Sequence, residues 1–327
     1  MQQRRLGRTG RDVSVIGLGT WQLGADWGDV DEADALAVLD AAADAGVTVF
    51  DTADVYGDGR SESIIGRWLA ANPASPMTVL TKFGRRLPAQ THDGYTAANL
   101  RAWADRSRRN LGVDTLDLVQ LHCPPTSVIE DDAVFDALDA LVSAGVIAAY
   151  GVSVETTGQA LTAIARPGVQ SVQIILNAFR LKPLDEVLPA AIAAETGIIA
   201  RVPLASGLLS GRYSETTAFP ANDHRTYNRH GEAFDVGETF SGVDFETGVA
   251  AAREFAALVP EGATPAQAAL AWIVAQPGVT TVIPGARGPE QARANAAAAA
   301  LTLPDGFDAA VRELYDRRFR AQVHPRW

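Results

Sequence analysis

Short apolar segments alternate with amphipathic segments through almost the whole chain, and this repeated order constrains the fold more than any other feature. The apolar segments are rich in Val, Ile and Leu, which is typical of parallel strands covered by helices. The segments between them carry apolar residues at helical spacing. The predicted strands fall in residues 14–21, 47–51, 77–82, 116–122, 146–153, 171–177, 198–204 and 280–285.

Eight regular strand-helix units favour an α/β fold of the (β/α)8 TIM-barrel type over an open doubly wound sheet, because the pattern does not change along the chain. With 327 residues, of which 47% are hydrophobic, we expect one barrel domain over residues 1–327. The segment RRLGRTGRDVSVIG, with Thr9 and Gly10 at a turn, predicts an N-terminal β-hairpin that plugs the barrel. Residues 212–243 follow the seventh strand without periodicity, so we expect a long lid loop there.

Two sequence patterns predict helix starts of the capping-box type. One is Ser127 with Glu130, and the other is Thr264 with Gln267, which also has Pro265 at the first helical position. Both patterns follow predicted strands, so the local signals agree with the strand-helix order.

The charge of the chain excludes two classes of partner. Lys and Arg number 28 against 39 Asp and Glu, and the formal net charge of -11 disfavours nucleic acid and anionic membrane surfaces. Cys123 is the single cysteine, so no disulfide framework is expected within the chain. The N-terminal residues lack the apolar core of a signal peptide, and no run approaches the length of a membrane span. We therefore expect a cytoplasmic protein.

Four polar residues lie where three successive predicted strands end. Asp51 and His122 end the second and fourth strands, Lys82 ends the third, and Tyr56 lies in the turn after Asp51. In a (β/α)8 barrel these strand ends meet at the rim that carries the active site. Asp51, Lys82 or Tyr56 alone is typical of a solvated loop, and His122 alone could be a buried histidine with satisfied hydrogen bonds. Four such residues at one rim indicate catalysis.

These residue types suit proton transfer to a carbonyl group. A neighbouring ammonium is expected to lower the pKa of a tyrosine from its usual value near 10, and Lys82 is placed to do this. Asp51 is expected to orient Lys82, and His122 to donate a hydrogen bond to the carbonyl oxygen. No residue of the four has the partner that a nucleophile requires, so reduction needs an external hydride, for which a nicotinamide cofactor is the natural source.

The motifs FDTADVYG (50–57), the strand-end Lys82 and LVQLHCPP (118–125) closely resemble those of the aldo-keto reductases. The resemblance extends from GLGTWQLG near the start to VIPGARGPEQARAN near the end. It implies an enzyme that reduces an aldehyde or ketone to an alcohol with NADPH, with NADH as the alternative cofactor. It also implies that Tyr56 is the general acid, that Lys82 and Asp51 tune it, and that His122 orients the carbonyl.

The resemblance also implies where the cofactor binds. Ser153 and Gln173 match positions that hold the nicotinamide carboxamide, residues 201–211 match the loop around the pyrophosphate, and Arg287 is expected to pair with a 2'-phosphate. This chain departs from many relatives in having Val154 in place of Asn. It also has Arg201 in place of Tyr and Gln291 in place of Arg. The predicted cofactor contacts are Thr20, Trp21, Asp51, Ser153, Gln173, Arg201, Val202, Pro203, Leu204, Ser206, Gly207, Leu209, Arg212, Gly285, Ala286, Arg287, Gln291 and Asn295.

The substrate is expected to be a small carbonyl compound that contacts Trp21, Trp27, Tyr56 and His122, with the tryptophans as an apolar wall or as core anchors. Two other functions stay open: an NADPH-binding regulatory subunit with little turnover, and a metal-dependent lyase or isomerase. No metal site is expected, because His224 and His230 in the predicted lid have no nearby cysteine. The sequence predicts neither the natural substrate nor the oligomeric state.

Overall fold

The computed structural model describes residues 1–24 and 30–327. In this part of the chain eight parallel strands form one sheet in sequence order. Parallel bridges join Ile16 to Val282 and Gly19 to Gly285, so the first strand lies beside the last and the sheet closes. The (β/α)8 barrel is therefore confirmed. Its strands are β3 (Leu18–Gly19), β4 (Val49–Asp51), β5 (Thr78–Phe83), β6 (Leu118–His122), β7 (Tyr150–Ser153), β8 (Val169–Ile175), β9 (Gly197–Arg201) and β10 (Val279–Val282).

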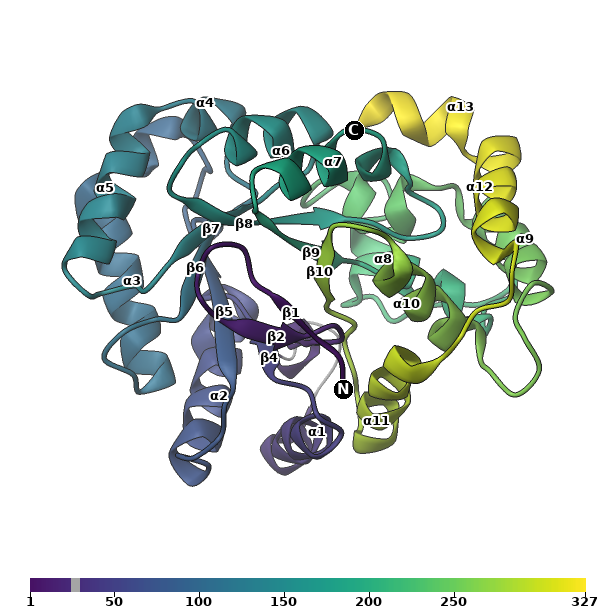
Figure 1. Ribbon diagram of the computed structural model, residues 1–327, viewed down its shortest axis with the longest axis horizontal. Coiled ribbons are helices and arrows are strands. Elements are labelled where there is room, and N and C mark those ends of the chain that lie inside the picture. Colours follow the sequence, from purple (N-terminus) through teal and green to yellow (C-terminus); the bar gives the residue numbers. More distant parts are fainter. Residues whose placement is uncertain (25–29) are drawn as a thin grey trace.

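Helices surround the strands (Figure 1). Helix α2, for example, buries an apolar face made of Ile64, Ile65 and Trp68. The helices are α1 (Glu32–Asp44), α2 (Arg60–Ala71), α3 (Ala97–Leu111), α4 (Thr126–Ile129), α5 (Asp132–Ser143), α6 (Thr157–Ile164), α7 (Val187–Ala193), α9 (Phe245–Ala256), α10 (Pro265–Ala275), α11 (Pro289–Ala297), α12 (Phe307–Arg318) and α13 (Arg320–Val323). In the described residues, no helix has the length and apolar character needed to cross a membrane.

The N-terminal hairpin closes one end of the barrel. Antiparallel β1 (Gln3–Arg5) and β2 (Asp12–Ser14) pair in register, and Leu6 and Val13 are fully buried. They share a cluster with inward-facing strand residues such as Leu80 and Ile199. The hairpin is drawn in purple across the middle of Figure 1. The predicted plug is confirmed, but the predicted start of the first barrel strand at residue 14 is wrong, because Ser14 pairs with Gln3 inside the hairpin.

The predicted lid lies between β9 and α9 and contains only short helical segments. These are α8 (His224–Tyr227), η6 (Val236–Glu238) and η7 (Phe240–Gly242), and η5 (Ala205–Ser210) precedes them. Ser206 Oγ donates to the Glu238 carbonyl at 3.1 Å and accepts from the Phe240 amide at 3.0 Å. Asn177 Nδ2, in the loop after β8, donates to Ser241 Oγ at 2.7 Å. The end of the lid is thus fastened over the carboxyl ends of the strands.

Only one of the two predicted capping boxes forms. Thr264 and Gln267 make reciprocal hydrogen bonds at the start of α10, as predicted. The prediction for Ser127 and Glu130 is wrong: α4 begins one residue earlier, at Thr126, and has no side-chain cap. Ser127 is therefore already inside the helix and cannot serve as its N-cap.

Candidate active site

A buried lysine connects two of the four predicted catalytic residues. Lys82 Nζ lies 2.5 Å from Asp51 Oδ1, 2.9 Å from the carbonyl oxygen of Thr52 and 3.5 Å from the hydroxyl oxygen of Tyr56. Lys82 is only 1% exposed and Asp51 only 2%. The His122 ring stands edge-on to the Tyr56 ring, with their centroids 5.9 Å apart. The structure therefore brings all four residues together at one rim.

The strands place three of these residues, and a tight loop places the fourth. Asp51 ends β4, Lys82 lies next to the end of β5, and His122 ends β6. Gly57 follows Tyr56 in the left-handed conformation, with φ of 57°. A Cβ atom at Gly57 would lie 2.2 Å from the carbonyl oxygen of Gly24, so only glycine permits this loop packing. The Tyr56 hydroxyl is directed to Lys82 as a result.

Two buried amides hold the second oxygen of Asp51. Gln173 Nε2 donates to Asp51 Oδ2 at 2.7 Å, and Gln120 Nε2 is 3.3 Å from the same oxygen. Gln173 was predicted to contact the cofactor, and it also lines the cavity described below. Gln120 was missed by the sequence reasoning. The signal was available, because Gln120 is a polar residue at the centre of an otherwise apolar strand.

The pKa of Tyr56 differs in direction from the sequence-based expectation. Burial raises the pKa of the phenol, and the positive charge of Lys82 offsets only part of this effect, so the pKa lies above its usual value. The expected net lowering is therefore wrong for this structure, because the desolvation of the phenol outweighs the charge of Lys82. A phenol of this kind keeps its proton at neutral pH.

The pKa values of Lys82 and His122 are shifted in opposite directions. Burial lowers the pKa of Lys82, but Asp51 and Tyr56 raise it by more in total, so the ammonium stays charged. Burial, Arg85 and Lys82 place the pKa of His122 well below its usual value. The imidazole is therefore neutral. Its Nδ1 atom is buried and has no hydrogen-bond partner among the described residues.

A cavity of about 840 Å³ opens beside Tyr56 and His122 and lies within the usual range for ligand pockets. All of the predicted cofactor residues line it except Ser153 and Leu209. Ser153 is 1% exposed, and Leu209 is fully buried in the core. Trp27 lies outside the described residues. The predicted contacts did not include several other lining residues: Gln22, Ser210, Tyr213, His224, Arg225, Glu238, Thr264 and Glu290.

One end of the cavity combines a glycine-containing turn with the starts of two helices. Ser206 and Gly207 are left-handed, with φ of 53° and 97°, and both line the cavity; the Gly207 amide donates to the Leu204 carbonyl at 2.9 Å. The N-terminal residues of α10 and α11 line the same end. Arg287 is about half exposed, and its Nη2 lies 3.9 Å from Asp223 Oδ2. Gln291 Oε1 accepts from the Arg287 amide at 2.9 Å and so fixes the turn before α11. The donor set suits the phosphates of a dinucleotide.

Asp54, two residues before Tyr56, is fully buried, and in the described part of the chain neither of its carboxylate oxygens has a hydrogen-bond partner. Burial and the neighbouring Glu62 raise its pKa to about 7. The folded state therefore holds a proton that the unfolded state loses near pH 4. The contribution of Asp54 to stability is therefore most favourable below the pKa of the unfolded state. It becomes less favourable as the pH rises toward the pKa of the folded state.

We expect Asp54→Asn to remove this pH dependence. The difference in unfolding free energy between variant and wild type should depend on pH. It should favour the variant by roughly 2 kcal/mol more at about pH 8 than at about pH 5. Urea unfolding at both pH values measures it. Asp58→Asn is the control: Arg86 lowers the pKa of exposed Asp58, so its effect should not change over this range. An equal effect of Asp54→Asn at both pH values would contradict the assignment.

The fold and the site agree with the comparisons with known proteins. A family model described as the aldo/keto reductase family matches residues 15–316. Aldo-keto reductase YhdN of Bacillus subtilis (strain 168) is 30% identical over 309 residues, which is 90% of this chain and 87% of that protein. An uncharacterized oxidoreductase, Rv2298 of Mycobacterium tuberculosis (strain ATCC 25618 / H37Rv), is 34% identical over 301 residues, covering 89% of this chain and 86% of that protein.

Two solved structures are also similar. The glycerol dehydrogenase AKR11B4 from Gluconobacter oxydans has a TM-score of 0.79 and 29% identity, with coverage of 97% of this chain and 95% of that one. The aldo-keto reductase AKR11C1 from Bacillus halodurans has a TM-score of 0.77 and 23% identity, covers 99% of both chains and supports the fold. The protein is an NAD(P)H-dependent oxidoreductase. The chain belongs to the aldo/keto reductase family.

Family membership decides between the alternatives left open by the sequence. The relatives are named as oxidoreductases, so the metal-dependent lyase or isomerase is set aside and the regulatory subunit is not favoured. Among the described residues, Cys123, Glu155 and Glu238 form a group of metal-ligand type. Both carboxylates pair with Arg85 or Arg201, so we assign this group to ion pairing.

Proposed function

We propose that the protein reduces an aldehyde or ketone to an alcohol with NADPH, with Tyr56 as the proton donor. The observation that carries this proposal is the buried row Asp51–Lys82–Tyr56, whose 2.5 Å and 3.5 Å contacts end at the cavity beside His122. The reverse oxidation uses the same residues in the opposite direction. Small-molecule carbonyl compounds are the proposed substrates.

The four residues divide the reaction between them. His122 donates a hydrogen bond to the carbonyl oxygen, and Tyr56 transfers its proton to that oxygen. Lys82 stabilises the phenolate that remains, which matters because burial otherwise disfavours it. Asp51 keeps Lys82 charged and fixed. A bound reduced nicotinamide supplies the hydride that reaches the carbonyl carbon.

The residues around the cavity support a dinucleotide with phosphate at one end. The left-handed turn at Ser206 and Gly207 and the start of α11 suit phosphate oxygens. Gln173 and Arg201 lie at the other end, near Tyr56. Arg201 ends β9 and lines the cavity, so it is a candidate contact of the nicotinamide end.

A direct test follows absorbance of NADPH and NADH during incubation with sugars, aromatic aldehydes, diketones and steroids. The similar protein AKR11B4 is named a glycerol dehydrogenase, so small hydroxylated carbonyl compounds such as glyceraldehyde belong in the panel. We expect oxidation of NADPH with at least one aldehyde or ketone. Tight cofactor binding without oxidation across the panel would contradict the proposal and support a regulatory role.

We propose that Arg287 confers a preference for NADPH by pairing with its 2'-phosphate. Arg287→Ala should weaken NADPH binding by about 10-fold or more and NADH binding much less, because a charge-assisted contact is lost for NADPH alone. Arg293→Ala, on the exposed surface of the same helix, is the control. Dissociation constants from tryptophan fluorescence measure both cofactors. Equal losses for the two cofactors would refute this role.

A further inference from the structure

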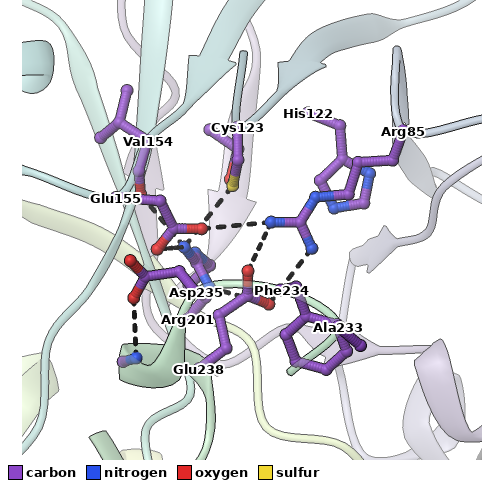
Figure 2. Close-up of polar contacts among 12 residues, drawn as sticks. Arg85, His122, Cys123, Val154, Glu155, Arg201, Ala233, Phe234, Asp235 and Glu238 are labelled. Carbon is purple, nitrogen blue, oxygen red and sulfur yellow. Dashed lines mark hydrogen bonds and ion pairs between the residues drawn. The ribbon is translucent and has the colours of Figure 1, made fainter. Parts of the chain in front are cut away.

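Two arginines and two glutamates lie together next to His122 (Figure 2); Arg201 and Glu238 are buried, while Arg85 and Glu155 are partly exposed. Arg85 follows β5, Glu155 follows β7, Arg201 ends β9 and Glu238 comes from the lid. Arg85 forms a close ion pair with Glu238, and its Nη2 lies 3.1 Å from Glu155 Oε1. Arg201 Nη2 lies 2.9 Å from Glu155 Oε2, and its Nη1 lies 3.5 Å from Glu238 Oε2. Each arginine therefore contacts both carboxylates.

Glu238 is the carboxylate of this cluster that a substrate meets. It lines the cavity together with Tyr56, His122 and Arg201. Burial alone would raise its pKa, but Arg85 and Arg201 hold the pKa of Glu238 far below its usual range. The pKa of Glu155, by contrast, is raised to about 7, chiefly because the carboxyl is buried. Glu238 therefore carries the firmly fixed negative charge at the substrate end of the cavity.

The nearby cations are already engaged by carboxylates. Among the described residues around Tyr56 and His122, Lys82 pairs with Asp51, while Arg85 and Arg201 pair with Glu155 and Glu238. A substrate carboxylate entering this region would lose its water and would have to share these cations with Glu155 and Glu238. It would also lie near the negative charge of Glu238, in surroundings where charge repulsion is stronger than in water.

Beside Tyr56 the cavity is lined by the rings of Trp21 and His224. Trp21 stacks against Tyr56 with ring centroids 6.0 Å apart, and Phe234 meets Trp21 edge-on at the same centroid distance. The His224 ring lies 5.1 Å from Trp21, and burial lowers the pKa of His224. This wall favours an apolar or neutral substrate body. The remaining lone pairs of Glu238 can accept hydrogen bonds from substrate hydroxyl groups.

We infer that Glu238 determines substrate charge: the enzyme selects neutral carbonyl compounds and rejects those that carry a carboxylate. The inference rests on the proposed carbonyl reduction. It makes Glu238 a specificity-determining residue supplied by the lid, with Arg85 holding it in place.

A matched pair of substrates tests this inference. 4-Formylbenzamide and 4-carboxybenzaldehyde have nearly the same shape, but the second carries a negative charge. The measured quantity is the ratio of kcat/KM for the neutral aldehyde to kcat/KM for the anionic aldehyde. Wild type should favour the neutral aldehyde by at least about 10-fold, since one close like charge is sufficient for discrimination of this size.

Two variants should change this ratio in opposite directions. Glu238→Gln keeps the shape but removes the charge, so the ratio should fall at least about 10-fold as Arg85 and Arg201 gain an excess of positive charge. Arg85→Gln removes one of the two positive charges beside Glu238, so the ratio should rise. Glu246 is an exposed residue of α9, so Glu246→Gln should leave the ratio unchanged. The inhibition constant of 4-carboxybenzyl alcohol should be lower in Glu238→Gln than in wild type, and higher in Arg85→Gln.

The outcomes separate the inference from the proposed function. If wild type turns over neither aldehyde nor any member of the carbonyl panel, the proposed function fails. If it reduces both aldehydes with similar kcat/KM, the inference is wrong while carbonyl reduction stands. A ratio that moves in the same direction in Glu238→Gln and Arg85→Gln also overturns it. If Glu238→Gln does not fold, as judged by circular dichroism, the wild-type ratio and Arg85→Gln decide.

Discussion

Tyr56→Phe is expected to lower kcat for carbonyl reduction by at least about 100-fold, which is the usual contribution of a general acid. The change removes one oxygen and keeps the ring, so the stacking of residue 56 with Trp21 is retained. The dissociation constant for NADPH should therefore change by no more than about 2-fold, which corresponds to less than about 0.5 kcal/mol. Steady-state kinetics with an active aldehyde and a fluorescence titration with NADPH provide the two measurements.

The matched control is Tyr315→Phe. Tyr315 is a fully buried tyrosine of α12, and α12 lies on the outside of the barrel. This variant also loses one hydroxyl, but it should keep most of the activity. Wild-type kcat in Tyr56→Phe would contradict the assignment of the proton donor. A large loss in both variants would indicate general damage to the fold.

Lys82→Met should have the second large effect, and it acts on stability as well as activity. Without the ammonium, Asp51 becomes a buried charge with amide donors only, so the free energy of unfolding should fall by about 3–5 kcal/mol. Activity should fall at least about 100-fold, because the Tyr56 phenolate loses its stabilising cation. Urea unfolding and steady-state kinetics measure the two effects.

The double variant Asp51→Asn/Lys82→Met separates these effects. It removes both charges of the buried pair, so it should recover much of the lost stability, as replacement of a buried ion pair often does. Activity should stay low. Recovery of activity together with stability would show that Lys82 has only a structural role, and this result would contradict the proposed mechanism.

The sequence predicted the parts of the fold and site that depend on local pattern. The eight apolar segments became strands, and Asp51, Lys82 and His122 meet because the carboxyl ends of neighbouring parallel strands lie at one rim. The hairpin turn and the Thr264 capping box likewise depend on residues a few positions apart. The predicted Ser127 capping box does not form, because α4 already begins at Thr126, directly after Pro125.

Features that depend on distant residues could not be predicted from local pattern. Glu238 and Arg85 are 153 residues apart, and the lid has no periodicity from which their contact could be inferred. The raised pKa of Tyr56 has the same origin: its sign depends on how deeply the loop is buried, which the motif FDTADVYG does not encode. The pairing of Arg201 with Glu155 is also tertiary.

Solvent isotope effects on a single turnover test most directly whether Tyr56 supplies the proton. Enzyme loaded with NADPH is mixed with an aldehyde in H2O or D2O, and the decay of reduced nicotinamide absorbance is followed. We predict slower decay of wild type in D2O, because the phenol proton moves with the hydride, and loss of this difference in Tyr56→Phe. An isotope effect of the same size in both proteins would contradict the central claim.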